Sequence, residues 1–216
     1  MMLLYALGIQ RPDMLWYFNQ VQDGQHRDGY FRNRPMGFLY MPDARKAPGT
    51  PDLPTSWLLK DFGWAMMRDS WKKDATMLAV KSGHTWNHSH ADANSLILFH
   101  KGVDILKDAG NCSYPNPEYR GYFFQSDAHN VVLFNGEGQS REQQYEGSYL
   151  RGSLHHLMDN GQVKYVLANG TGPMADKFSR NFRHFLWMDK VIYVIDDIKA
   201  HHAGHFEWLW HYSGKA

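Results

Sequence analysis

Residues 181–199 read NFRHFLWMDKVIYVIDDIK and predict a pair of antiparallel strands. Aromatic and β-branched residues fill Asn181–Met188 and Val191–Lys199, and such side chains favour the pleated, half-buried surface of a sheet. The intervening Asp189-Lys190 has the length of a tight hairpin turn. This hairpin predicts that at least the C-terminal part of the chain is built from antiparallel strands.

Short runs of the same composition recur upstream and downstream of this hairpin, separated by turn residues. Lys101-Gly102, Asn135-Gly136 and Asn160-Gly161 stand where inter-strand turns are needed. The other runs are Trp57–Arg68, Ala75–Lys81, Ser95–Lys101, Val103–Lys107, Asn130–Phe134, Tyr149–Met158, Gln162–Ala168 and Phe206–Tyr212. Many short strands at close intervals are typical of a mainly β protein, here an antiparallel β-sandwich.

The N-terminal part of the chain has a different pattern. Residues 1–22 predict two short helical pieces, and residues 23–54 are dense in Gly, Pro, Arg and Asp, as in a connector. We therefore expect a helical segment and connector over residues 1–50 and a β-sandwich over residues 51–216. Two isolated helices cannot bury an apolar face well, so we expect them to be a remnant of a longer helical domain.

The net charge and the distribution of apolar residues indicate which classes of binding partner to exclude. Lys and Arg number 23 and Asp and Glu 22, so a net charge of +1 provides no field to attract nucleic acid or an anionic membrane. The chain has no run of about 20 apolar residues, which a membrane span requires. The single Cys112 excludes an internal disulfide. We expect neither nucleic acid nor membrane as a partner, and any anionic partner must be recognised locally.

A group of histidines and carboxylates predicts a metal site. Residues alternate sides along a strand, so His88 and His90 of the stretch Asn87-His88-Ser89-His90-Ala91-Asp92 are expected to face the same way. Asp108 ends a predicted hairpin that runs on from His90, and His129 opens a further predicted strand. Two imidazoles and one carboxylate form a ligand set typical of zinc. We expect Zn²⁺ to be bound by His90, Asp108 and His129.

These motifs, in their order along the chain, resemble the C-terminal region of heparinase II/III-type polysaccharide lyases, a family that also includes alginate lyases. The resemblance covers about residues 57–212. It is carried by Asn87–Asp92, by Gly102, by Asp108-Ala109-Gly110 and by Ala128-His129-Asn130-Val131-Val132. Members of the family join an α/α toroid to antiparallel β-sheets. The resemblance therefore implies that the N-terminal helices are a remnant of an α/α toroid and that the rest of that toroid is missing.

The resemblance also implies an activity and residue roles. It implies β-elimination on an anionic, uronate-containing polysaccharide, metal ligands at His90, Asp108 and His129, and a catalytic histidine at His88. Four residues are implied in substrate binding: Asn87, Tyr114, Tyr119 and Tyr122. In the family the general-acid tyrosine comes from the toroid, so this fragment is expected to be weakly active or inactive alone. A location in the periplasm or outside the cell is implied as well.

Two other functions are open at this stage. His90 and Asp92 with the distant His129 have the spacing of an iron-dependent oxygenase triad, which would replace Asp108 by Asp92. The second alternative is a non-catalytic β-domain that binds carbohydrate, or one that binds only a structural zinc ion. Asp92 either hydrogen-bonds a ligand imidazole or caps a turn.

Overall fold

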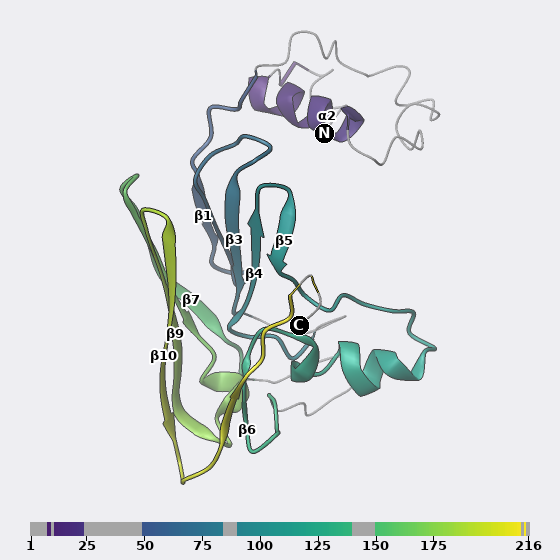
Figure 1. Cartoon of the computed structure of the whole chain (residues 1–216), viewed down its shortest axis with the longest axis vertical. Helices are drawn as coiled ribbons and strands as arrows, with labels where there is room; N and C mark the ends of the chain where they lie inside the picture. Colours follow the sequence, from purple (N-terminus) through teal and green to yellow (C-terminus); the bar gives the residue numbers. More distant parts are fainter. Residues whose placement is uncertain are drawn as a thin grey trace. The chain divides into compact units, whose positions relative to one another are not determined.

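The structure, a computed structural model, describes residues 8–9, 11–23, 49–83, 90–139, 150–212 and 214. The chain divides into two compact units, Met1–Pro54 and Thr55–Ala216. In the described part of the first unit there is one helix, α2 (Pro12–Asp23), with proline in its first turn, where a missing N–H costs no hydrogen bond (Figure 1). The earlier predicted helical piece lies outside the described residues. No helix within the described ranges is both long and apolar enough to cross a bilayer.

The second unit begins with a five-stranded antiparallel sheet whose strands follow one another in chain order. Its strands are β1 (Ser56–Leu59), β2 (Trp64–Arg68), β3 (Thr76–Lys81), β4 (Ser95–His100) and β5 (Val103–Leu106). The predicted single strand Trp57–Arg68 is wrong, because residues 60–63 turn back and pair its two halves. Gly63 allows this turn, since it has a φ of +68° and a Cβ there would lie 2.2 Å from the Cα of Gly83.

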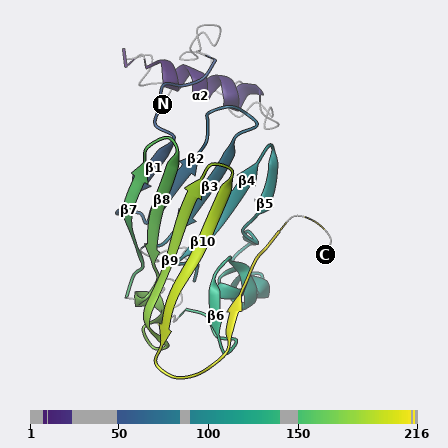
Figure 2. The same cartoon turned by 60° about the vertical axis from the view of Figure 1, so that its left-hand side comes forward.

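A four-stranded antiparallel sheet faces the first one. Its strands are β7 (Ser153–Asp159), β8 (Val163–Asn169), β9 (Phe178–Met188) and β10 (Val191–Ala200), in the order β10-β9-β8-β7. Met188 pairs with Val191, which confirms the predicted hairpin. A short third ladder joins β6 (Val132–Phe134) to β11 (Phe206–Trp208), beside the larger sheets in Figure 2.

Alternate residues of the two larger sheets meet in a common hydrophobic core. The first sheet contributes Ala65, Met67, Leu78, Val80 and Leu96, and the second contributes Leu154, Val166, Ala168, Phe185 and Trp187. Each fully buried large aliphatic or aromatic side chain contributes about 1.5–3 kcal/mol of transfer free energy. The predicted antiparallel β-sandwich is confirmed by this two-layered arrangement, seen in Figures 1 and 2.

Two of the tight turns are formed by pairs of residues that both adopt a positive φ. Lys101 and Gly102 have φ of 49° and 85°, and Asn135 and Gly136 have 53° and 75°. Two consecutive positive φ angles are those of a type I′ turn, whose twist matches the flanking strands. These two predicted turns are therefore confirmed.

A polar cluster at the end of β7 ties this strand to the start of β1. Oδ2 of Asp159 accepts hydrogen bonds from Thr55 Oγ1 at 3.0 Å, from Ser56 Oγ at 2.6 Å and from the largely buried Lys164 ammonium. Burial by itself would raise the pKa of the Asp159 carboxyl, but these bonds and one from the Gly161 N–H outweigh it and hold the pKa well below its usual range. The ionised carboxylate therefore stabilises the contact between the two sheets.

Replacing Asp159 by Asn should lower the free energy of unfolding at pH 7 by about 2 kcal/mol, because it leaves the Lys164 charge without its counter-ion. A depressed pKa in the folded state stabilises above the unfolded pKa, and this stabilisation is lost as the pH falls towards the folded value. The difference between D159N and the wild type should therefore shrink from about pH 5 downwards. Urea unfolding at several pH values measures it, and a difference that does not change with pH would contradict this account.

Candidate metal centre

The three predicted metal ligands come from three segments that end or begin near one another. His90 precedes β4, Asp108 follows β5, and these antiparallel strands bring the two residues to the same end of the sheet. His129 directly follows a 3₁₀ helix, Ser126–Ala128. The expectation that His90 and His129 lie in strands is wrong. Residues 91–94 form a tight turn in which Asn94 has a φ of 66°, and β6 begins only at Val132.

The side chains of His90, Asp108 and His129 converge. One candidate ligand atom from each lies within 4.8 Å of the other two. Nδ1 of His129 lies 2.6 Å from Oδ2 of Asp108, and the two imidazole ring centroids are 5.1 Å apart. His129 is fully buried, and its Nε2 has no hydrogen-bond partner among the described residues. An unpartnered buried imidazole nitrogen is costly, and a cation at this position would remove that cost. The residues present therefore fit a divalent metal.

Two hydrogen bonds join the residues on either side of the Asp108–His129 pair, one between backbone groups and one from a side-chain amide. The Ala109 N–H donates to the Ala128 carbonyl at 3.2 Å, and Asn130 Nδ2 donates to the Lys107 carbonyl at 3.0 Å. Each bond joins a neighbour of Asp108 to a neighbour of His129. One main-chain bond and one bond from the Asn130 amide therefore hold the two segments together beside the pair.

Electrostatics at the cluster favour the protonation states that a metal needs. Burial lowers the pKa of His90, and the nearby His129 lowers it further, so the ring stays neutral at pH 7. Burial alone would raise the pKa of Asp108, but the hydrogen bond with His129, the charge attraction of the two imidazoles and the bond from the Gly110 N–H together outweigh it, and the pKa lies below its ordinary value. A neutral imidazole and an ionised carboxylate are the forms that bind metal ions.

Aromatic residues enclose His90 on one side. Its ring centroid lies 6.4 Å from that of Tyr119 and 6.1 Å from that of Phe124, both buried. Tyr119 belongs to a short π-helix, η2 (Tyr119–Phe123). The ring of Tyr114 packs edge-on against the Tyr119 ring, with the two centroids 4.9 Å apart. Tyr114 and Tyr122 are exposed, whereas Tyr119 is 2% exposed. Of the three predicted tyrosines, Tyr119 thus contacts the cluster and the other two are accessible to solvent.

Asp92 lies beside the cluster without joining it. Its Oδ2 accepts a hydrogen bond from Lys81 Nζ at 2.6 Å, and its carbonyl accepts one from the Ser95 N–H in the turn. The structure thus groups Asp108, and not Asp92, with the two histidines. The predicted catalytic His88 and the predicted substrate-binding Asn87 lie outside the described residues.

The side chain of Asn130 has a structural role that the sequence pattern did not indicate. Its Nδ2 donates to the Leu96 and Lys107 carbonyls, and its Oδ1 accepts from the His211 N–H at 2.6 Å. These partners are 34, 23 and 81 residues away, so no local pattern could have identified them. The only signal was the position of Asn130 directly after a predicted ligand.

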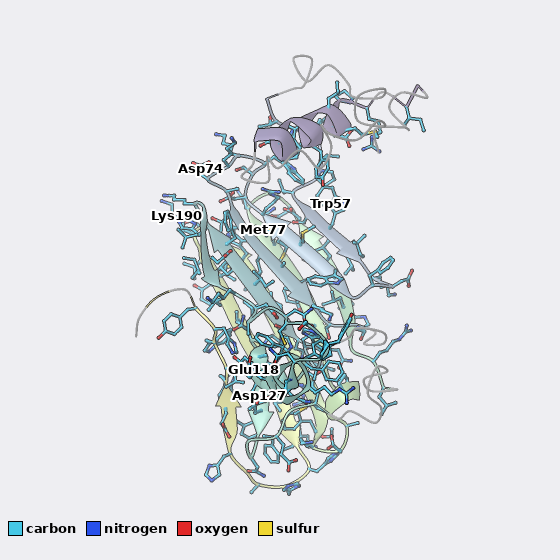
Figure 3. The ribbon with its side chains drawn as sticks, turned by 90° about the vertical axis from the view of Figure 1, so that its right-hand side faces the viewer. Trp57, Asp74, Met77, Glu118, Asp127 and Lys190 are labelled. Atoms are coloured by element: carbon cyan, nitrogen blue, oxygen red, sulfur yellow. The ribbon has the colours of Figure 1, made fainter. Side chains whose placement is uncertain are left out.

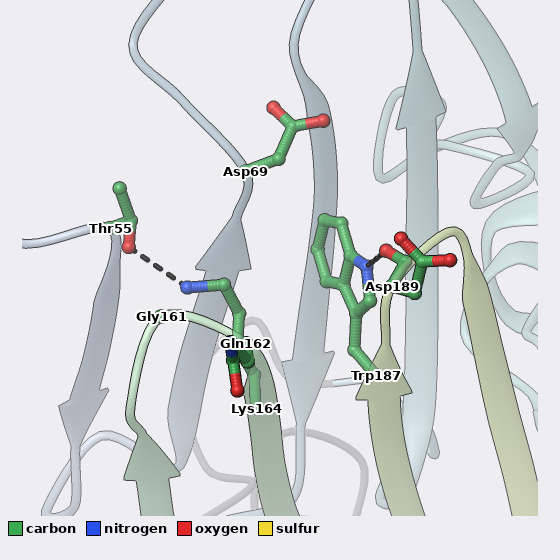
Figure 4. Close-up of a pocket in the computed structure, with 7 residues that line it drawn as sticks. All are labelled: Thr55, Asp69, Gly161, Gln162, Lys164, Trp187 and Asp189. Carbon is green, nitrogen blue, oxygen red and sulfur yellow. Dashed lines mark hydrogen bonds between the residues drawn. The ribbon is translucent and has the colours of Figure 1, made fainter.

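A separate cleft opens at the far end of the sandwich. It has a volume of about 520 Å³ and is lined by Thr55, Asp69, Gly161, Gln162, Lys164, Trp187 and Asp189 (Figure 4). The pairing of β3 with β4 places Thr76 and His100 near this end and Lys81 and Ser95 near the metal centre. Figure 3 shows the same two ends, with Asp74 and Lys190 at one and Glu118 and Asp127 at the other. The cleft is therefore not part of the metal centre.

The fold and the cluster together define an antiparallel β-sandwich with a His–Asp–His cluster, at the ends of its strands, that could hold a metal ion. Residues 51–216 match the family model described as "Heparinase II/III-like, C-terminal", and the chain belongs to this family. It is 28% identical over 103 residues to the heparin-sulfate lyase of Bacteroides stercoris, a match that covers 45% of this chain and 15% of that protein.

Solved structures share the fold. A mutant of heparan sulfate lyase HepC from Pedobacter heparinus superposes with a TM-score of 0.62 and 18% identity, covering 91% of this chain and 28% of that one. A structure of heparinase III has a TM-score of 0.60 and 17% identity, covering 74% of this chain and 25% of that one. The chain thus spans less than a third of the length of these relatives.

Metal analysis tests the cluster directly. The purified chain should bind one equivalent of zinc, and D108A or H129A should weaken binding by more than about 100-fold, beyond the 10–100-fold loss typical when only a partner of a ligand is changed. D92N should retain zinc, because Asp92 pairs with Lys81. Competition with a chromophoric chelator measures the affinities. Zinc lost in D92N but kept in D108A would favour the oxygenase triad.

Proposed function

We propose that this chain is the metal-binding β-sandwich part of a polysaccharide lyase that cleaves uronic-acid-containing polysaccharide by β-elimination. The observation that carries the proposal is the convergence of His90, Asp108 and His129 in a chain of the heparinase II/III-like family. The named activities of the relatives, heparin-sulfate and heparan sulfate lyase, support a uronate polymer as the substrate.

The proposed reaction removes the proton at C5 of the uronate and expels the oxygen at C4. A base takes the C5 proton, the electron pair forms the C4–C5 double bond, and an acid donates a proton to the departing oxygen. The C5 proton is only weakly acidic, so the adjacent carboxylate must also be neutralised. The reaction therefore needs a base, an acid and a carboxylate-binding group around one sugar.

We assign the base to His88, two residues before the ligand His90 in the sequence. Histidine titrates near neutral pH, which suits a general base. Asn87 would donate hydrogen bonds to the substrate beside it. The complementary acid is assigned to a tyrosine of the α/α toroid found in the family, and helix α2 would belong to that domain.

The proposed zinc ligands are His90, Asp108 and His129. When bound, a zinc ion supplies positive charge and fixes the relative positions of its ligands. Other residues of the chain shield and position these ligands. Tyr119 and Phe124 exclude water from one side of the His90 ring, and the bonds around Asn130 hold His129 in place. The rigid position of His90 would in turn direct the nearby His88.

Tyr114 and Tyr122 are the tyrosines we assign to the substrate. Both rings are exposed, and the hydroxyl of Tyr122 lies 3.5 Å from Nε2 of His211. Aromatic rings pack well against the apolar C–H faces of sugars. The buried Tyr119 is assigned to packing against His90. For an enzyme that degrades such polysaccharides we propose a location in the periplasm or outside the cell.

Lyase chemistry is tested by incubating the zinc-loaded chain at high concentration with heparan-type and alginate-type oligosaccharides. The expected product has an unsaturated sugar at its new non-reducing end, detected by ultraviolet absorbance and mass. Turnover should be slow, because the toroid acid is not in this chain, and H88A should lower it by about 100-fold or more. H205A is the matched control, since His205 is exposed and contacts Asn135 through its backbone N–H.

Two outcomes would contradict the proposal. Products without the double bond would indicate hydrolysis, and an unchanged rate in H88A would remove the assigned base. Oligosaccharide binding without any turnover, unaffected by H88A, would instead favour a non-catalytic carbohydrate-binding domain.

The tyrosine assignments make a separate prediction. Y114A and Y122A should weaken oligosaccharide binding by about tenfold each while leaving the zinc affinity unchanged, because both side chains are exposed. Y119A should lower the free energy of unfolding by about 3–5 kcal/mol, as a large buried aromatic does when truncated. Titration calorimetry and urea unfolding separate the two effects. Equal losses of oligosaccharide affinity in all three variants would refute the assignment.

A further inference from the structure

A buried arginine of the second sheet reaches the segments that carry both histidines. Arg183 lies on β9 and is 1% exposed. Its Nε and Nη2 donate to the two carboxylate oxygens of Asp196, at 2.7 and 3.0 Å, and its Nη1 donates to the Asn94 carbonyl at 3.0 Å and to the Asn130 carbonyl at 2.8 Å. We call these four hydrogen bonds the Arg183 bridge.

The two carbonyls belong to the chain segments that hold the metal ligands. Asn94 lies in the tight turn that directly follows His90, and Asn130 directly follows His129. A single nitrogen atom, Nη1, therefore joins the segment of one histidine to the segment of the other. The paired Asp196 is held in turn by Trp208 Nε1 at 2.8 Å, so the guanidinium has little freedom to turn.

A buried ion pair is an expensive way to stabilise a fold. Both charges lose their hydration, and an apolar pair of similar volume is often at least as stable. The Arg183–Asp196 pair buries both partners, with side-chain exposures of 1% and 8%. A planar guanidinium with several donors in a fixed geometry offers what an apolar pair cannot, namely the directional restraint of two separate carbonyls.

We infer that Arg183 is a positioning residue that sets the separation of the His90 and His129 segments and thereby the affinity of the centre for a divalent metal. The inference rests on the proposed metal-binding function. Lysine keeps the charge but has one nitrogen, which cannot pair with Asp196 in two places and also reach two carbonyls. Within the described residues the hydrogen bonds of Arg183 go to Asp196 and to two backbone carbonyls, so its proposed action on the ligands runs through the backbone.

The test compares R183K with F185L in the 216-residue chain. Phe185 lies on the same strand, is fully buried in the sandwich core and takes no part in the Arg183 bridge. Both variants should lose stability to urea. R183K should also bind zinc about 10–100-fold more weakly, as partners of metal ligands do, whereas F185L should bind zinc as the wild type does. The visible spectrum of the cobalt-substituted protein should change in R183K only.

The outcomes separate the inference from the proposal on which it rests. A wild-type chain that binds no zinc refutes the metal centre and the inference with it. If the wild type binds zinc and R183K binds it equally well with an unchanged cobalt spectrum, the inference alone is refuted. If zinc affinity falls equally in R183K and F185L, it follows global stability and the positioning role is again refuted. Should R183K not fold, D196N provides the same comparison, because it weakens the anchor and leaves Arg183 in place.

Discussion

The hydrogen bond between Nδ1 of His129 and Oδ2 of Asp108 is the contact on which the candidate metal centre depends. It occupies one nitrogen of a fully buried imidazole and leaves the other unpartnered among the described residues. A buried polar atom in that state needs a partner, and the adjacent His90 and the Asp108 carboxylate supply the surroundings that suit a cation. The remaining features of this end of the sandwich hold the three side chains in place.

The candidate metal centre and the hydrophobic core occupy different parts of the sandwich. Both sheets bury alternate side chains between them, and this core accounts for the stability of the sandwich. The ligands lie beyond the strand ends, where the backbone is irregular and its polar groups need other partners. Asn130 and Arg183 provide such partners, and their hydrogen bonds tie the segments of His90 and His129 to the two sheets.

The chain belongs to the heparinase II/III-like family, and its His–Asp–His cluster could hold a metal ion; both observations support the proposed polysaccharide lyase. The matched relatives are several times longer than this chain, and an elimination reaction needs an acid and a base on either side of the sugar. In the proposed function, the sandwich contributes the candidate metal centre and the segment around His90. In the proposed mechanism, the groups of a second domain complete the site.

Sequence patterns by themselves determined most of the strands and turns and the short list of residues from which the candidate ligands come. Alternating side chains and turn residues such as Lys101-Gly102 act locally, and a set of metal-binding residue types in family order is visible without coordinates. Only the tertiary structure decided that residues 60–63 split one predicted strand, that His90 and His129 lie outside strands, and that Asp108 rather than Asp92 joins them. The role of Arg183 was equally hidden, because its carbonyl partners are 53 and 89 residues away and such contacts exist only once both sheets have packed.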